Sequence, residues 1–123
     1  MKINLADEND VRRFAEEYIK ALQKGDSNWH LKNADFKGML ERNKQQSSMY
    51  SETTLEEFEK EFKDGAYLLK NKWKAKFTIK SINVTGDKAE VEIEREGAKS
   101  IASPLILSKK SGMWKYIMGA VWF

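Results

Sequence analysis

Residues 73–96 read WKAKFTIKSINVTGDKAEVEIERE, and this stretch decides the fold. Apolar and polar residues alternate on both sides of Gly86-Asp87, with the period of two that is typical of half-buried strands. A glycine at this point favours a two-residue turn between antiparallel strands. Val84 then opposes Ala89, and the apolar residues of both strands share one face of a hairpin.

The alternation slips by one residue in the first of these strands. In an unbroken register Lys80 opposes Ile93, which mixes a charged and an apolar side chain on one face. One extra residue at about Lys80–Ile82 removes the conflict. Ile79 then opposes Ile93. On the other face Lys80 opposes Glu92. The sequence therefore predicts a β-bulge, and a bulge bends a sheet so that its concave side can enclose a pocket.

The polar face of this hairpin carries lysines on one strand and glutamates on the other. The chain has a formal net charge of +3, and its basic excess lies in the second half. Such an excess can mark a nucleic-acid footprint, but here the glutamates offset part of it. We therefore expect a solvated face of mixed charge, and nucleic acid is not an expected partner. The two series are Lys72, Lys74, Lys76 and Lys80, and Glu90, Glu92, Glu94 and Glu96.

Two more strands are expected towards the C-terminus. The first covers 102–108, and Pro104 indicates an edge or a bulge within it. A turn at Lys110-Ser111 leads into a last strand, 113–123, which is apolar on both faces and is expected to be central or doubly covered. The register that this turn implies pairs Leu107 with Trp114, Leu105 with Tyr116 and Ser103 with Met118.

Helices occupy the first half of the chain. Apolar residues recur with a period of 3.6 between Val11 and Leu22, which predicts one amphipathic helix, with Asp7 as its cap and Gly25 at its end. A second helical region follows Ser27 and is expected to break at Gly38. A third begins at a capping box formed by Thr54 and Glu57. Its apolar stripe is Leu55, Phe58, Phe62 and Leu69.

Three short motifs add a resemblance to a known family. They are Ala-Leu-Gln-Lys-Gly-Asp at 21–26, Thr-Gly-Asp-Lys-Ala-Glu-Val at 85–91 and Ser-Gly-Met-Trp-Lys-Tyr at 111–116. With helices first and long strands after, the chain resembles the nuclear transport factor 2-like superfamily, which includes SnoaL-like and ketosteroid isomerase-like proteins. The resemblance implies a single α+β domain over 1–123. Its N-terminal helices pack in the concave face of a strongly curved antiparallel sheet, a cystatin-like cone.

The same resemblance directs attention to acid–base groups inside the cone, because enzymes of this superfamily usually place an Asp, His or Tyr there. His30 is the single histidine of the chain, and Asp35 follows it closely enough to orient it. We take His30 with Asp35, or with Tyr18, as candidate catalytic residues. The alternative is a partly exposed histidine without a catalytic role. The glutamates of the second strand lie on the wrong face for catalysis.

Aromatic side chains give a second set of candidates, for ligand binding. Arg95 shares the face of Val91 and Ile93, where it can anchor an anion at the cavity mouth or extend to water from a strand end. The aromatic residues can line an apolar pocket or simply fill the cone. The candidate ligand-binding residues are Tyr18, Trp29, Arg95, Trp114, Tyr116, Met118 and Trp122.

The leading functional hypothesis is a non-catalytic domain that binds a small apolar molecule or a protein partner. Alternatives are a small isomerase- or dehydratase-like enzyme and an inhibitor or immunity-type interaction protein. The resemblance also implies a homodimer through the sheet, which would cover Trp122 and Phe123. With no cysteine and no metal-ligand or phosphate-loop motif, we expect no cofactor and no metal. No apolar stretch reaches membrane-spanning length, and no signal peptide is evident, so a cytoplasmic location is favoured over an exported domain with a trimmed signal.

Overall fold

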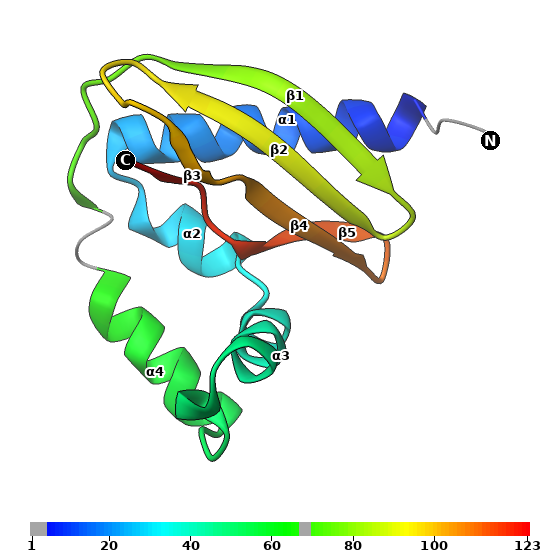
Figure 1. The fold of residues 1–123 in the computed structure, drawn as a ribbon, viewed down its shortest axis with the longest axis vertical. Coiled ribbons are helices and arrows are strands. Elements are labelled where there is room, and N and C mark those ends of the chain that lie inside the picture. Colours follow the sequence, from blue (N-terminus) through cyan, green and yellow to red (C-terminus); the bar gives the residue numbers. More distant parts are fainter. Residues whose placement is uncertain (1–4, 67–69) are drawn as a thin grey trace.

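A long helix lies along the concave side of a curved antiparallel sheet, and shorter helices form an arm beside it (Figure 1). The computed structural model describes residues 5–66 and 70–123. Leu69, expected in an apolar stripe, lies outside the described residues, as do residues 1–4. This is the α+β cone that the sequence predicts. The elements are α1 (Leu5–Lys24), α2 (Ser27–Asn33), α3 (Phe36–Gln46), the 3-10 helix η1 (Ser48–Tyr50), α4 (Leu55–Gly65), β1 (Phe77–Thr85), β2 (Lys88–Arg95), β3 (Ile101–Ser103), β4 (Leu105–Lys110), β5 (Met113–Met118) and β6 (Val121–Trp122).

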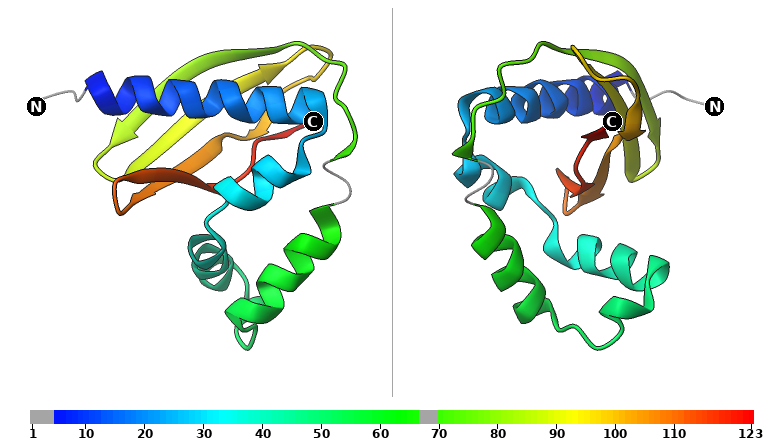
Figure 2. Two further views of the ribbon diagram at one scale, coloured as in Figure 1. Left: turned by 180° about the vertical axis from the view of Figure 1, so that it is seen from behind. Right: turned by 60° about the vertical axis from the view of Figure 1, so that its left-hand side comes forward.

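Helix α1 buries one face in the hollow of the sheet, and Figure 2 shows this arrangement from two further sides. Val11 is completely buried on that face. The helix ends at Gly25, whose φ of +68° confirms the predicted left-handed C-terminal residue. Its start differs from the prediction, because the helix already begins at Leu5. Asp7 therefore lies in the first turn, where its carboxylate pairs with Lys109 Nζ at 2.8 Å.

Strands β1 and β2 form the predicted hairpin, including its bulge. Ile79 opposes Ile93, and the register shifts before Ser81. One pairing is corrected: Ser81, not Lys80, opposes Glu92. Lys80 is itself the extra residue, which a bulge leaves without a partner in the ladder. Because the bulge restores the alternation, the apolar residues of both strands face α1.

The residues around Trp73 pack against the end of α1 and precede the sheet. The alternating pattern starts at Trp73, but β1 begins only at Phe77. The backbone N–H of Trp73 donates to the carbonyl of Leu22, with an N···O distance of 3.1 Å. Its ring packs on Phe77 and Trp122, with centroids 6.1 and 5.8 Å apart. This segment thus satisfies a free carbonyl at the end of α1.

Pro104 separates two strands that belong to different sheets. The four-stranded sheet has the order β1-β2-β4-β5, and β3 pairs with β6 in a second sheet of two strands. The expected single strand over 102–108 is therefore wrong. Proline has no N–H to donate to a ladder, so it stands where the chain changes partners.

Strand β5 is the last strand of its sheet, so it is not central, but its neighbouring residues Tyr116 and Ile117 are both buried, which agrees with the alternative of a doubly covered strand. The turn before it is Ser111-Gly112, both with positive φ (52° and 77°), rather than Lys110-Ser111. Leu107 therefore opposes Tyr116, and the predicted register is displaced. A turn with two positive φ angles matches strand twist, and glycine fits its second position. The Asp35 N–H donates to the Tyr116 carbonyl at 2.9 Å, so part of this edge is covered by the chain between α2 and α3.

The helical arm consists of α3, η1 and α4 and stands apart from α1 in all views (Figures 1 and 2). Gly38 lies inside α3 and does not break it; the break comes at Ala34 and Asp35. The capping box of α4 is confirmed, since Glu57 N donates to Thr54 Oγ1 at 3.2 Å. None of the helices in the described ranges is long and apolar enough to cross a bilayer.

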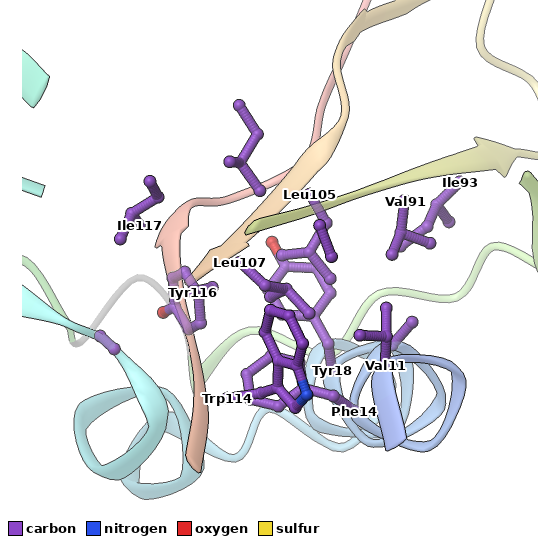
Figure 3. Close-up of a cluster of buried hydrophobic side chains, with 14 of the residues drawn as sticks. Val11, Phe14, Tyr18, Val91, Ile93, Leu105, Leu107, Trp114, Tyr116 and Ile117 are labelled. Atoms are coloured by element: carbon purple, nitrogen blue, oxygen red, sulfur yellow. The ribbon is translucent and has the colours of Figure 1, made fainter. Parts of the chain in front are cut away.

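The core lies between α1 and the sheet. Figure 3 shows side chains from α1 meeting those of β2, β4 and β5 there. Val91 and Ile93 are fully buried, as the hairpin pattern predicts. Tyr18 and Tyr116 belong to this core and also reach its border with the helical arm.

Candidate functional site

A pocket of about 320 Å³ opens where the cone meets the helical arm. Its volume is within the range of small-molecule sites, and its wall is mostly apolar with a few polar atoms. Every helix of the described chain except η1 contributes to it, together with β5 and the residue after it. The lining residues are Tyr18, His30, Met39, Asn43, Phe58, Phe62, Tyr116, Ile117, Met118 and Gly119.

His30 is the most buried polar residue of this pocket, with 1 % of its surface exposed. It lies on α2, which starts at an aspartate cap: the Trp29 N–H donates to Asp26 Oδ1 at 3.1 Å. Its Nδ1 lies 3.2 Å from the hydroxyl oxygen of Tyr116. Its Nε2 is buried and has no hydrogen-bond partner among the described residues. Burial lowers the pKa of His30 to about 4 against the opposing effect of Asp26, so the ring is neutral at neutral pH.

Two tyrosines frame this histidine. The rings of Tyr18 and His30 meet edge to face with centroids 5.4 Å apart, and those of His30 and Tyr116 are 6.0 Å apart. The Tyr18 hydroxyl oxygen accepts a hydrogen bond from the Ala120 N–H at 3.2 Å. Burial raises the pKa of Tyr18 to about 12 and also raises the pKa of Tyr116. Both hydroxyls therefore keep their protons at neutral pH.

These properties suit recognition by hydrogen bonds better than proton transfer. A general base works best with a pKa near the operating pH, and the pKa of His30 is well below it. The pKa values of Tyr18 and Tyr116 are raised instead, so their hydroxyls are poor acids at neutral pH. The pocket therefore offers neutral polar atoms against an apolar wall.

Asp35 lies at the start of α3, and its partners differ from the predicted one. Its carboxylate accepts from the Gly38 N–H at 3.0 Å, from Ser108 Oγ at 3.1 Å and from Lys110 Nζ at 3.0 Å. Tyr116, not Asp35, is the hydrogen-bond partner of the His30 ring. Desolvation alone would raise the pKa of Asp35, but the hydrogen bonds from Gly38 and Lys110 outweigh it and hold this pKa below the ordinary 3.8. Its role here is to join α3 to β4.

We expect Asp35→Ala to lower the free energy of unfolding by about 1 kcal/mol, because it removes a helix cap. Asp35→Asn keeps a capping oxygen and loses only the charge, so it should cost less at pH 7. Since the carboxyl pKa is lower in the folded chain, the advantage of wild type over Asp35→Asn should persist above pH 3.8 and fade below it. Urea unfolding of both variants between pH 2.5 and 7 measures this. If Asp35→Ala and Asp35→Asn lowered the free energy of unfolding equally, the capping role of Asp35 would be contradicted.

The predicted ligand-binding residues fall into three places. Tyr18, Tyr116 and Met118 line the pocket with His30. Trp29 and Trp114 do not line it: Trp29 stacks on Tyr116 with centroids 6.3 Å apart, and Trp114 packs into the core. At the far end of β2, the guanidinium of Arg95 lies over the rings of Trp73 and Trp122, 5.2 and 5.7 Å from their centroids. Trp122 Nε1 donates to the Ile93 carbonyl at 2.7 Å. These side chains thus pack on one another away from His30.

Sequence reasoning missed the part of the pocket that the arm supplies. Phe58 and Phe62 stand one helical turn apart on α4 and are half-buried, and the Phe62 ring packs on Phe36 with centroids 5.1 Å apart. Their spacing predicts an apolar stripe, but no local pattern indicates which surface the stripe covers. Among residues 5–66 and 70–123, no group of three or more His, Cys, Asp or Glu side chains is arranged to hold a metal ion.

The curved sheet around α1, with a polar-edged pocket at its border, defines a protein of the nuclear transport factor 2-like cone fold. The chain belongs to the family described as "Putative lumazine-binding", whose model matches residues 6–122. Searches for similar curated proteins and for similar solved structures found no match.

Proposed function

We propose that this chain is a non-catalytic binding domain, one nuclear transport factor 2-like unit over 1–123, that holds a small, flat molecule with an apolar face and a polar edge in the pocket between α1, α2, β5 and the helical arm. The ligand's face packs on the phenylalanines of α4, and its polar edge meets His30 and Tyr18. The family description points to lumazine as the first candidate. A lumazine is flat, aromatic and small enough for a pocket of about 320 Å³.

One observation carries this proposal: the buried Nε2 of His30 has no partner among the described residues and belongs to a side chain that lines the pocket. Buried polar atoms nearly always have a hydrogen-bond partner, and a buried atom without a partner lowers the free energy of unfolding. A ligand atom that displaces the side chains covering Nε2 would supply the missing partner. The low pKa of His30 supports binding over acid–base catalysis, and we therefore propose no reaction.

Titration of the chain with lumazine tests the proposal. We expect saturable binding, followed by the fluorescence of lumazine or of the tryptophans. Phe62→Ala should weaken binding about tenfold, because it removes an aromatic wall of the pocket. Phe123→Ala is the matched control, since Phe123 is 75 % exposed and does not line the pocket. Absence of saturable binding, or an equal effect of the two variants, would overturn the proposal.

A further inference from the structure

The hydrogen bonds around His30 determine which kind of ligand atom the pocket can accept. We infer that Tyr116 holds His30 as the tautomer with its hydrogen on Nε2, so that the pocket presents hydrogen-bond donors and selects ligands by a carbonyl oxygen. This inference rests on the proposed ligand pocket and specifies the chemistry of its occupant.

The first step concerns the proton between His30 and Tyr116. Their contact at 3.2 Å can run in two directions. If Tyr116 donates its O–H to Nδ1, the imidazole hydrogen is on Nε2. If Nδ1 donates instead, the Tyr116 hydrogen has no acceptor among the described residues, and the Nε2 lone pair is also unpaired. The first direction leaves fewer buried groups without a partner, and it is therefore the one we assign.

The second step concerns Tyr18. Its oxygen accepts from the Ala120 N–H at 3.2 Å, and no hydrogen bond in the described part of the chain uses its own hydrogen. Tyr18 and His30 both line the pocket, with ring centroids 5.4 Å apart. Two residues that line the pocket thus carry donors that lack acceptors, Nε2–H of His30 and the Tyr18 O–H. A buried donor without an acceptor is costly, whereas an acceptor oxygen with one free lone pair is tolerated more readily. The two unpaired donors therefore favour a ligand that brings acceptors.

The remaining lining residues do not change this preference. None of them is an aspartate or a glutamate, so a cationic or amino group would find no carboxylate there. Asn43 carries both a donor and an acceptor and can present either. A neutral molecule with carbonyl oxygens supplies the acceptors that these two donors lack, since each carbonyl oxygen has two lone pairs. A molecule with an amino group in the same place would add a third donor beside two donors that already lack acceptors, so it should bind more weakly.

The tautomer can be read directly, because His30 is the one histidine in the chain. A long-range ¹H–¹⁵N spectrum of the ¹⁵N-labelled protein at pH 7 distinguishes the protonated from the unprotonated ring nitrogen. We expect Nε2 to carry the hydrogen in wild type. In Tyr116→Phe, which keeps the ring but removes the hydroxyl, the two tautomers should mix. Tyr50→Phe removes a hydroxyl outside the pocket and should leave the spectrum unchanged. A wild-type hydrogen on Nδ1 would overturn the inference.

The ligand preference is measured with a matched pair of probes, lumazine and 2,4-diaminopteridine, which replaces both carbonyl oxygens with amino groups. We expect lumazine to bind at least about tenfold more tightly at pH 7. Tyr18→Phe should reduce this ratio because it removes one of the two donors. Equal or reversed affinities would overturn the inference even with the predicted tautomer. If neither probe binds while Nε2 carries the hydrogen, the tautomer assignment stands, and both the proposed binding function and the inferred ligand preference fall.

Discussion

Gly25→Ala is expected to lower the free energy of unfolding by about 3 kcal/mol, a large fraction of the stability of a domain of this size. A Cβ at this position would lie 2.2 Å from the carbonyl oxygen of Lys70, and backbone atoms cannot move aside as a flexible side chain can. The φ of +68° adds a cost for any residue with a side chain. The glycine is needed because the segment from Lys70 to Trp73 crosses the end of α1 at this point. Urea unfolding of the variant measures the loss.

Gly97→Ala is the matched control for this prediction. Its φ of +87° imposes the same kind of backbone strain, but no atom lies within 4 Å of the added Cβ. We therefore expect it to cost about 1 kcal/mol, and the difference between the two variants isolates the close approach of Lys70. If both variants lost the same amount, the contact between the end of α1 and the segment before β1 would not be as the structure has it.

The second large effect is a loss of stability in mild acid that depends on His30. Its pKa is about 4 in the folded chain and 6.5 ordinarily. Between these values the unfolded chain binds more protons than the folded one, so the free energy of unfolding falls as the pH falls from 6.5 to about 4. The buried ring should contribute about 3 kcal/mol to this fall, because protonation places a charge against an apolar wall. Stability is restored as the pH rises again.

His30→Phe keeps an aromatic ring and removes the titration. Plotted against pH, the unfolding free energies of wild type and variant should converge or cross between pH 6.5 and 4, because only wild type loses the contribution of His30. The carboxylates are the same in both proteins, so their effect cancels in the difference. Tyr18, Tyr116 and Asp26 are the titratable groups that act on His30. Of these, Asp26 is the one carboxylate, and its charge favours the imidazolium. Parallel curves over this range would show that the ring is not held neutral by burial.

Several elements were predictable because their causes lie within a few residues of the chain. The Gly86 turn, the bulge next to Ile79 and the inward side of Val91 all follow from an alternation that permits one register. The capping box at Thr54 is equally local. The membership of Tyr18 in a buried face follows from the 3.6-residue period of α1.

The predictions were wrong where the local sequence allowed two positions for one feature, or where a contact with a distant segment decided the role of a residue. Lys80 and Ser81 were both acceptable as the extra residue, because either restores the alternation, and only the observed register identifies Lys80. Gly38 was expected to break a helix, but it lies inside α3, where the missing side chain lets β5 approach: a Cβ there would lie 2.7 Å from Ile117. A glycine that permits a close approach is indistinguishable, by sequence, from one that ends a helix.

The sequence by itself determined the order of helices and strands, the bent hairpin and the apolar faces, because periodicity and turn chemistry act between near neighbours. The tertiary structure alone decided the pocket. It brought His30 of α2 to Tyr116 of β5, 86 residues apart, and placed Phe62 of the helical arm opposite them. It also gave Asp35 partners other than His30 and placed Arg95 over two tryptophan rings. Such contacts depend on how whole elements pack, and the free energy of packing is shared among many side chains that no local pattern connects.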